Sequence, residues 1–135
     1  MRLFTCLILS LVFLCGCGSN EPYPVAVKGT VSLDGKPLAE GQISFITLGQ
    51  VPEPVEIKDG KFQGKAKWGS RRVEIAAYRP YPIPPSVPLS MHALMKDGKE
   101  NYLPEIYHTH STLTAEVQKN GNNDFTYDLK TQPEE

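Results

Sequence analysis

The sequence predicts an all-β protein, an antiparallel β-sandwich of seven strands. Three observations predict this fold. Apolar and polar residues alternate along several short segments, as they do on a strand with one buried face. Turn-forming pairs such as Asp-Gly and Asn-Gly separate those segments. The 12 Pro and 11 Gly are spread along the chain, which favours strands joined by turns over long helices.

Seven segments carry the strand pattern. They are residues 25–33, residues 42–48, a strand through Val55 and Ile57, a strand from Phe62, and residues 71–78, 112–117 and 125–129. Each has an inward row of apolar side chains, for example Val25, Val27, Val31 and Leu33 in the first, or Phe125, Tyr127 and Leu129 in the last. Asp34-Gly35 and Asp59-Gly60 provide turn chemistry, because Gly accepts a positive φ angle.

Residues 79–101 interrupt the pattern. Pro80, Pro82, Pro84, Pro85 and Pro88 lie within nine residues, so this stretch is expected to be extended and not to form a central strand. Residues 91–96 are compatible with about one helical turn. Long insertions between strands often carry function, and this Pro-rich insertion is therefore our hypothesis for a contact surface.

The start of the chain has the pattern of an export signal. Arg2 precedes an apolar run over residues 3–14, which is too short to span a bilayer comfortably. Leu14-Cys15-Gly16-Cys17 follows and resembles a bacterial lipobox. The resemblance implies a diacylglycerol on Cys17 and cleavage before it. The alternatives are an ordinary signal peptide or a short membrane anchor.

The expected organisation follows from that site. Residues 1–16 form the signal peptide, 17–24 the lipidated cysteine and a short tether, 25–131 the sandwich, and 132–135 a polar tail. All three cysteines lie within the first 17 residues, so the rest of the chain has no thiol for a disulfide. Ser19 is not the Asp that favours retention in the inner membrane of enteric bacteria, which favours the outer membrane.

Two parts of the chain carry a family resemblance. Residues 27–45 resemble the opening hairpin of carboxypeptidase-regulatory-like, transthyretin-like domains. Residues 103–107, 111–117 and 125–129 resemble the closing segment of small lipoproteins of this type from planctomycetes. The resemblance implies a seven-stranded, prealbumin-like sandwich without a known activity. The chain lacks the Tyr-Arg-Gly-Ser ending of the transthyretin-like 5-hydroxyisourate hydrolases and the His-x-x-Glu signature of zinc peptidases.

Two sets of residues are candidates for a binding site. His108 and His110 would share one face of a strand and so could meet one metal ion, with Glu105 or His92 as a further ligand. The competing interpretation is a polar loop before a strand. The second set is aromatic, and its rings would form a flat surface for sugars or peptides, or else pack the insertion onto the sandwich. This set is Trp68, Tyr78, Tyr81, Tyr102 and Tyr107.

Composition narrows the expected function. The chain has 14 Lys and Arg against 15 Asp and Glu, and this balance excludes a basic stripe for nucleic acid. No nucleophile motif or phosphate-binding loop is present, so we expect neither an enzyme nor a cofactor. The expected function is a membrane-tethered envelope lipoprotein that serves interaction or structure, with an envelope protein or polysaccharide as partner. The alternative is an extracytoplasmic metal-binding or transport-accessory protein that uses His108 and His110.

Overall fold

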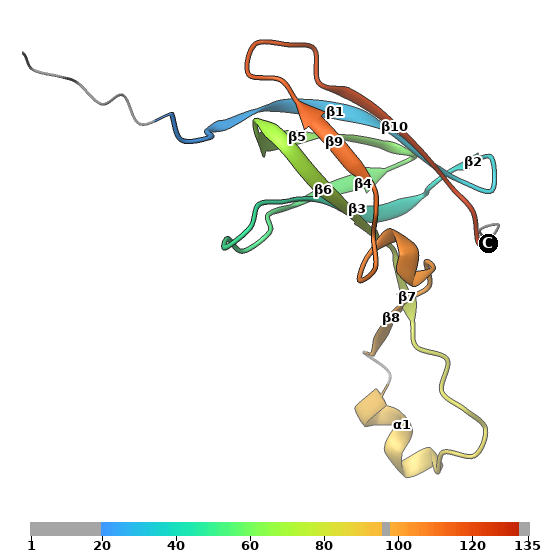
Figure 1. Cartoon of the computed structure of the whole chain (residues 1–135). Coiled ribbons are helices and arrows are strands. Elements are labelled where there is room, and N and C mark those ends of the chain that lie inside the picture. The colour runs from blue at the N-terminus through green and yellow to red at the C-terminus, as the bar shows by residue number, and fades with distance from the viewer. Residues whose placement is uncertain (1–19, 96–97, 133–135) are drawn as a thin grey trace, which may run out of the picture.

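The computed structural model describes residues 20–95 and 98–132 (Figure 1). The predicted signal peptide and the predicted lipidation site, Cys17, lie outside the described residues. The strands are β1 (Pro24–Leu33), β2 (Lys36–Pro37), β3 (Glu40–Ile46), β4 (Pro54–Lys58), β5 (Lys61–Lys67), β6 (Gly69–Ala76), β7 (Tyr78–Pro80), β8 (Lys99–Asn101), β9 (Thr114–Val117) and β10 (Asp124–Leu129). The helices are α1 (Leu89–Met95) and a 3₁₀ helix, η1 (Glu105–Tyr107).

The all-β prediction is confirmed, and the main sheet runs in the order β10-β1-β5-β4-β3-β6-β9, with β2 beside β1. Each of these seven strands overlaps one of the seven expected segments. Their hydrogen bonds form one continuous path through a curled sheet (Figure 1). The expectation of purely antiparallel pairing was wrong at one position, because β10 pairs with β1 in parallel. The connection from β9 crosses between the two edges of the sheet, so β10 arrives beside β1 in the same direction.

The core lies inside the curl. The sheet turns a corner at β4 and β5, which share only the pairs Ile57–Phe62 and Lys58–Lys61. The ring of Phe45 on β3 therefore lies 6.2 Å from the ring of Phe62 and 6.0 Å from that of Phe125, centroid to centroid. The predicted inward rows supply the buried side chains, among them Val27, Val31, Ile43, Val73, Ile75, Ala115, Val117, Tyr127 and Leu129. Burial of this apolar surface is the main stabilising term of the fold.

Both Asp-Gly pairs form the turns that the sequence predicts. Asp34 and Gly35 have φ angles of 50° and 78°, and Asp59 and Gly60 have φ angles of 50° and 72°. Two successive positive φ angles are the signature of the type I′ turn, which matches the twist of the strands that it joins. These turns set the register of β1 with β2 and of β4 with β5.

Side chains close the gap between the edge strands β9 and β10. The Tyr127 hydroxyl on β10 donates to the Thr114 carbonyl oxygen on β9 at 3.3 Å. Asn123 is 5 % exposed, and its amide nitrogen donates to the carbonyl oxygens of Ala26 and Gln118 at 3.1 and 3.0 Å. Its amide oxygen accepts the Gln118 N–H at 2.7 Å. Asn123 thus hydrogen-bonds the polar loop between β9 and β10 to β1.

Several expected boundaries differ from the structure: the strand expected over residues 71–78 ends at Ala76, and the one expected over 112–117 begins at Thr114. The strand expected over residues 42–48 ends at Ile46, because residues 47–50 turn away with Gly49 at φ 76°. Leu48 is consequently 95 % exposed. The Pro-rich insertion was expected to be extended apart from about one helical turn over residues 91–96; α1 covers Leu89–Met95, and the ends of the insertion pair as β7 and β8. It projects from the sheet as an arm, defined as residues 78–101 (Figure 1).

Candidate functional site

The outer face of β3 and β6 carries a row of polar side chains. Pairing of the two strands places Gln42 opposite Ala76 and Ser44 opposite Glu74. Their chain neighbours, such as Ile43, are buried in the core, so these residues point outward because successive side chains on a strand alternate between faces. Arg72 continues the row, two residues before Glu74 on β6.

Two walls turn this face into a hollow of about 500 Å³, which we call the outer recess. The base of the arm forms one wall, with Tyr78 and Asn101, and the turn after η1 forms the other, with His108 and Thr109. The complete lining is Gln42, Ser44, Arg72, Glu74, Ala76, Tyr78, Asn101, His108 and Thr109. These residues come from four separate parts of the chain.

The arm's base is fixed to the sheet. The Asn101 side-chain oxygen accepts the backbone N–H groups of Ala77 and Leu103, both at 3.2 Å. Arg79 pairs with Glu100 at 2.6 Å across the β7–β8 ribbon. Because both lone pairs of the Asn101 oxygen are used, its NH₂ group is the part of the amide that remains to donate to a ligand. The wall is therefore preorganised.

The opposite wall is fixed by His108. Its Nε2 lies 3.1 Å from the Leu103 carbonyl oxygen, and its Nδ1 lies 2.9 Å from the Thr109 hydroxyl oxygen. A neutral imidazole satisfies both contacts if Nε2–H donates to the carbonyl and Nδ1 accepts the hydroxyl proton. This arrangement holds the turn against the segment that follows the arm.

The charges of the recess are paired. Arg72 and Glu74 form an ion pair at 2.5 Å, with 46 % and 29 % of their side chains exposed. A second recess of about 360 Å³ shares Gln42 and Tyr78 with the first. There Lys58 pairs with Glu56 at 3.0 Å, and this hydrogen bond raises the pKa of the Lys58 amine above its usual value. The half-exposed ring of Tyr78 thus lies between two polar hollows.

The five predicted aromatic residues do not form one surface. Tyr78 lines the outer recess, Tyr81 lies further out on the arm, and Tyr102 lies under Arg79 with its ring centre 5.7 Å from the guanidinium carbon. Tyr107 packs in the core with 7 % exposed, because η1 turns it inward, where its hydroxyl accepts the Lys130 N–H.

Trp68 lies far from the arm. It precedes β6, whereas the arm leaves after the end of that eight-residue strand, which corresponds to a separation of roughly 26 Å. Its contacts are with Tyr23 at the other end of the sheet. Trp68 therefore lies at the opposite end of β6 from the aromatic residues of the arm.

The histidines do not converge on one point. Residues 108–110 form a turn, as the competing interpretation of the sequence had it, so His108 and His110 do not share a strand face. Both ring nitrogens of His108 have protein partners, while His110 Nδ1 faces Glu105 at 3.1 Å. His92 lies on α1, against the Val87 carbonyl oxygen. Within residues 20–95 and 98–132, no three His, Cys, Asp or Glu side chains gather at a metal-binding distance.

Sequence reasoning missed the floor of the recess. Gln42 and Ser44 on one strand and Arg72 and Glu74 on another are separated by about 30 residues and become neighbours only when β3 pairs with β6. Their outward positions in the alternating pattern were the available signal. The alternating pattern identifies the face of a strand that points to solvent, but it does not indicate which strands lie next to each other.

Comparisons with known protein families, with curated proteins and with solved structures find no match to this chain. In the part of the chain that the structure describes, no helix is long and apolar enough to cross a membrane.

Proposed function

We propose that this chain is a lipid-anchored, non-catalytic binding module of the cell envelope, and that the outer recess holds a neutral polyhydroxylated ligand, the chemistry of a glycan. The observation that carries the proposal is the lining of the recess. Amide and hydroxyl side chains supply both donors and acceptors there, for example Gln42, Ser44 and Asn101. Sugar hydroxyl groups also donate and accept, so the two surfaces are complementary.

The charge of the recess favours a neutral ligand. Arg72 is paired with Glu74, so neither charge is left to bind a phosphate or a carboxylate. The two groups still offer further hydrogen-bonding positions, since a guanidinium has five N–H donors and a carboxylate about four acceptor sites. Such a pair is suited to hydroxyl groups.

Tyr78 supplies the apolar part of the surface. Its side chain is 52 % exposed between the two recesses, at the rigid base of the arm. An aromatic face of this kind packs against the C–H face of a pyranose ring, while the hydroxyl groups reach the polar side chains. A chain of sugars extending across both recesses would place one unit on Tyr78.

The anchor and the fold family belong to the same proposal. The lipobox-like sequence supports a lipid on Cys17, three residues before the described chain begins, and Ser19 favours the outer membrane over the inner. The agreement of the seven main strands with the expected segments supports a transthyretin-like sandwich. Intact mass of the protein purified from membranes tests the anchor. We expect the acyl mass on the wild type, and an equal mass on a Cys17→Ser variant would refute the assignment.

Binding is tested with the full chain on a panel of neutral oligosaccharides, namely cello-, manno-, xylo- and chito-oligomers, followed by calorimetric titration of any that bind. Tyr78→Ala should weaken binding about tenfold, the loss of one aromatic contact of about 1.4 kcal/mol. The matched control is Tyr81→Ala, which removes a ring of 42 % exposure on the arm but outside the recess. We expect the Tyr81→Ala variant to bind with wild-type affinity.

Two outcomes would overturn the glycan proposal. One is an absence of binding across the whole panel by a folded wild type. The other is an equal loss of affinity in the Tyr78 and Tyr81 variants, which would assign the ligand to the arm as a whole. Recovery of the bound oligosaccharide unchanged after incubation tests the non-catalytic part, and its cleavage would refute that part.

A further inference from the structure

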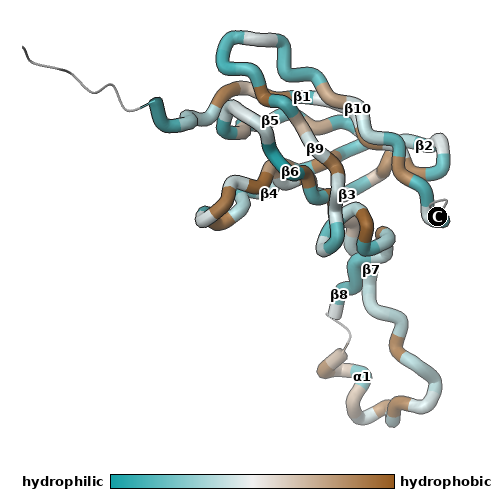
Figure 2. Tube along the Cα trace, in the orientation of Figure 1, coloured by the Kyte–Doolittle hydropathy of each residue, from teal (hydrophilic) through white to brown (hydrophobic). Residues whose placement is uncertain are grey.

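The loop between β3 and β4 exposes large apolar side chains. Leu48 is 95 % exposed and Val51 is 89 % exposed, although both belong to a residue type that is usually inside. Figure 2 shows apolar colour on this loop, which lies at the side of the molecule from which the chain runs towards its N-terminus. Neither side chain contributes to the core, so the fold itself does not account for them.

An aromatic and basic cluster lies at the same end. The rings of Tyr23 and Trp68 meet edge to face, with centroids 6.5 Å apart. The Lys119 ammonium lies 5.5 Å from the centre of the first ring and 5.7 Å from that of the second. Arg71 fixes this corner by donating to the carbonyl oxygens of Lys67 and Trp68 at 2.9 and 2.5 Å.

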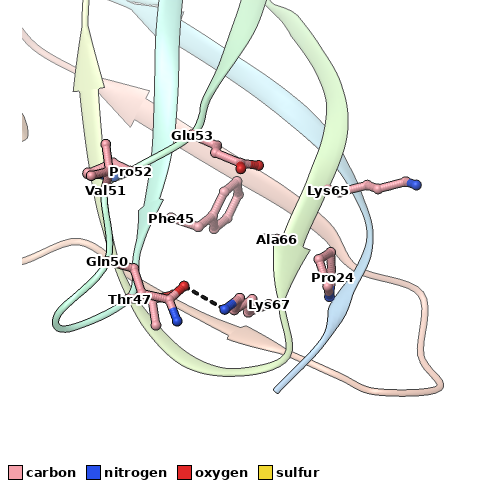
Figure 3. Close-up of a pocket in the computed structure, with 10 residues that line it drawn as sticks. All are labelled: Pro24, Phe45, Thr47, Gln50, Val51, Pro52, Glu53, Lys65, Ala66 and Lys67. Carbon is pink, nitrogen blue, oxygen red and sulfur yellow. Dashed lines mark hydrogen bonds between the residues drawn. The ribbon is translucent and has the colours of Figure 1, made fainter. Parts of the chain in front are cut away.

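A small cavity of about 100 Å³ joins the loop to this cluster (Figure 3). Val51 lines it from the loop and Pro24 from the start of β1, directly after Tyr23. The Lys67 ammonium donates to the side-chain oxygen of Gln50 at 2.5 Å, the contact drawn as a dashed line in Figure 3. The loop tip is thus held beside the aromatic residues. We call this region the anchor-side end, defined by Tyr23, Leu48, Val51, Trp68 and Lys119.

The combination of side chains at this end matches a membrane interface. Tyr and Trp are enriched at the level of lipid headgroups, where an apolar ring and a polar edge are both accommodated. Tyr23 is 46 % exposed and offers both, whereas Trp68 is partly buried against the core with its Nε1 covered and offers only ring surface. Lys amines pair with headgroup phosphates while their stems lie along apolar surface. Lys65 and Lys67 add to the charge of Lys119 here, and Glu21 and Glu53 offset part of it. The exposed apolar side chains are therefore expected to contribute as much to a membrane contact as the positive charge does.

The position of the N-terminal segment indicates which partner would cover the anchor-side end. The described chain begins at Asn20, next to this end, and Cys17 is three residues earlier. Tyr23 is six residues after Cys17, a span of at most about 22 Å, so a lipid on that cysteine would hold Tyr23 and its neighbours within that distance of the bilayer. A surface with this composition and this attachment point has a phospholipid bilayer as its nearest partner.

We propose that the anchor-side end is a second membrane contact, in which Leu48 and Val51 insert among phospholipid headgroups while Tyr23, Trp68 and Lys119 lie at the interface. This inference rests on the proposed anchor at Cys17. Its consequence is a fixed orientation, because the base of the arm lies beyond the far end of β6, roughly 26 Å from Trp68 on the lipid side. The outer recess extends along β6 from Arg72 to that base, so its arm-side wall, with Tyr78 and Asn101, is the part farthest from the membrane.

The test uses lipidated full-length protein in phosphatidylcholine and phosphatidylglycerol vesicles that contain a headgroup nitroxide lipid. Trp68 is the sole tryptophan, so quenching of its fluorescence reports contact of this end with the headgroups. We expect quenching of the wild type and a loss of about twofold or more in Leu48→Asp/Val51→Asp, because Asp is costly to place in the interface. The matched control is Leu89→Asp/Leu94→Asp on the arm, where exposure is 84 % and 82 %.

The outcomes separate the contact from the anchor. Protein that floats with the vesicles and carries the acyl mass but shows no quenching would overturn the contact and leave the anchor standing. Equal loss of quenching in both double variants would also overturn it. Protein without the acyl mass would refute the anchor and this inference together, while oligosaccharide binding would remain an independent result.

Discussion

Replacement of Gly29 by alanine probes the parallel pairing of β1 with β10. Gly29 lies in the middle of β1, opposite Phe125 on one side and Phe62 on the other. An added Cβ would overlap the Phe125 carbonyl oxygen and lie 2.7 Å from the Phe62 ring, whereas ordinary contact begins at 3.4 Å. One of these groups is backbone and the other is a packed core ring, so neither can move without separating strands.

The expected cost is about 3 kcal/mol of unfolding free energy, the upper part of the range for overpacked cores, because the clash falls within a ladder of six paired residues. This corresponds to a fall in Tm of roughly 10–20 °C for a domain of this size. Thermal and urea unfolding followed by circular dichroism measures it. Thr30→Ala, the next residue on the outer face, is the control and should change stability by less than about 0.5 kcal/mol. A cost below about 1 kcal/mol for Gly29→Ala would refute the close parallel approach of β10.

Two further predictions concern the closure of the sheet. Burial raises the pKa of Tyr127 to about 12, above its usual value of 10.0, so between about pH 10 and 12 the folded state keeps a proton that the unfolded state loses, and stability should fall as the pH rises. Urea unfolding midpoints should therefore decrease across that range. Tyr127→Phe should reduce this decrease, and an unchanged decrease would contradict the assignment. Asn123→Ala should cost about 1–3 kcal/mol, because it removes the three part-buried hydrogen bonds that the buried Asn123 amide makes with the backbone of Gln118 and Ala26. The exposed neighbour Asn122→Ala should be near neutral in the same denaturation assay.

The two proposals together describe a molecule with opposite ends. The anchor-side end carries Trp68 and the exposed loop, and the other end of β6 carries Tyr78 and the arm-side wall of the outer recess. The short tether would hold the first end at the lipid surface, and the length of β6 would place Tyr78 beyond it. A sugar unit on Tyr78 would then be held at the end of the recess that is farthest from the membrane.

The strands themselves followed from the sequence. Alternation over residues 25–33 predicted a strand with Val27 and Val31 inside, because one face of a half-buried strand must be apolar wherever it packs. Asp59-Gly60 predicted a hairpin, because two successive positive φ angles are cheap only for such pairs. These are local constraints, and local constraints are visible in a short stretch of residues.

The candidate site did not follow from the sequence in the same way. Tyr78, one of the predicted aromatic residues, lines the outer recess, but the prediction also grouped Tyr107 and Trp68 with it. Closeness in sequence to the Pro-rich insertion suggested the grouping, whereas the direction of η1 and the length of β6 decided against it. Whether a tyrosine faces solvent or core depends on the surface that is available to cover it.

The sequence by itself determined the strand segments, their inward rows and the two type I′ turns, because each depends on residues within a few positions of one another. Only the tertiary structure decided that β10 lies parallel to β1, that Gln42 and Glu74 share one floor, and that Leu48 and Trp68 lie at one end. Strand pairing brings distant residues together, and its choice rests on the total burial of the curled sheet. The total buried area depends on all the strands together, so it cannot be read from any single stretch of the sequence.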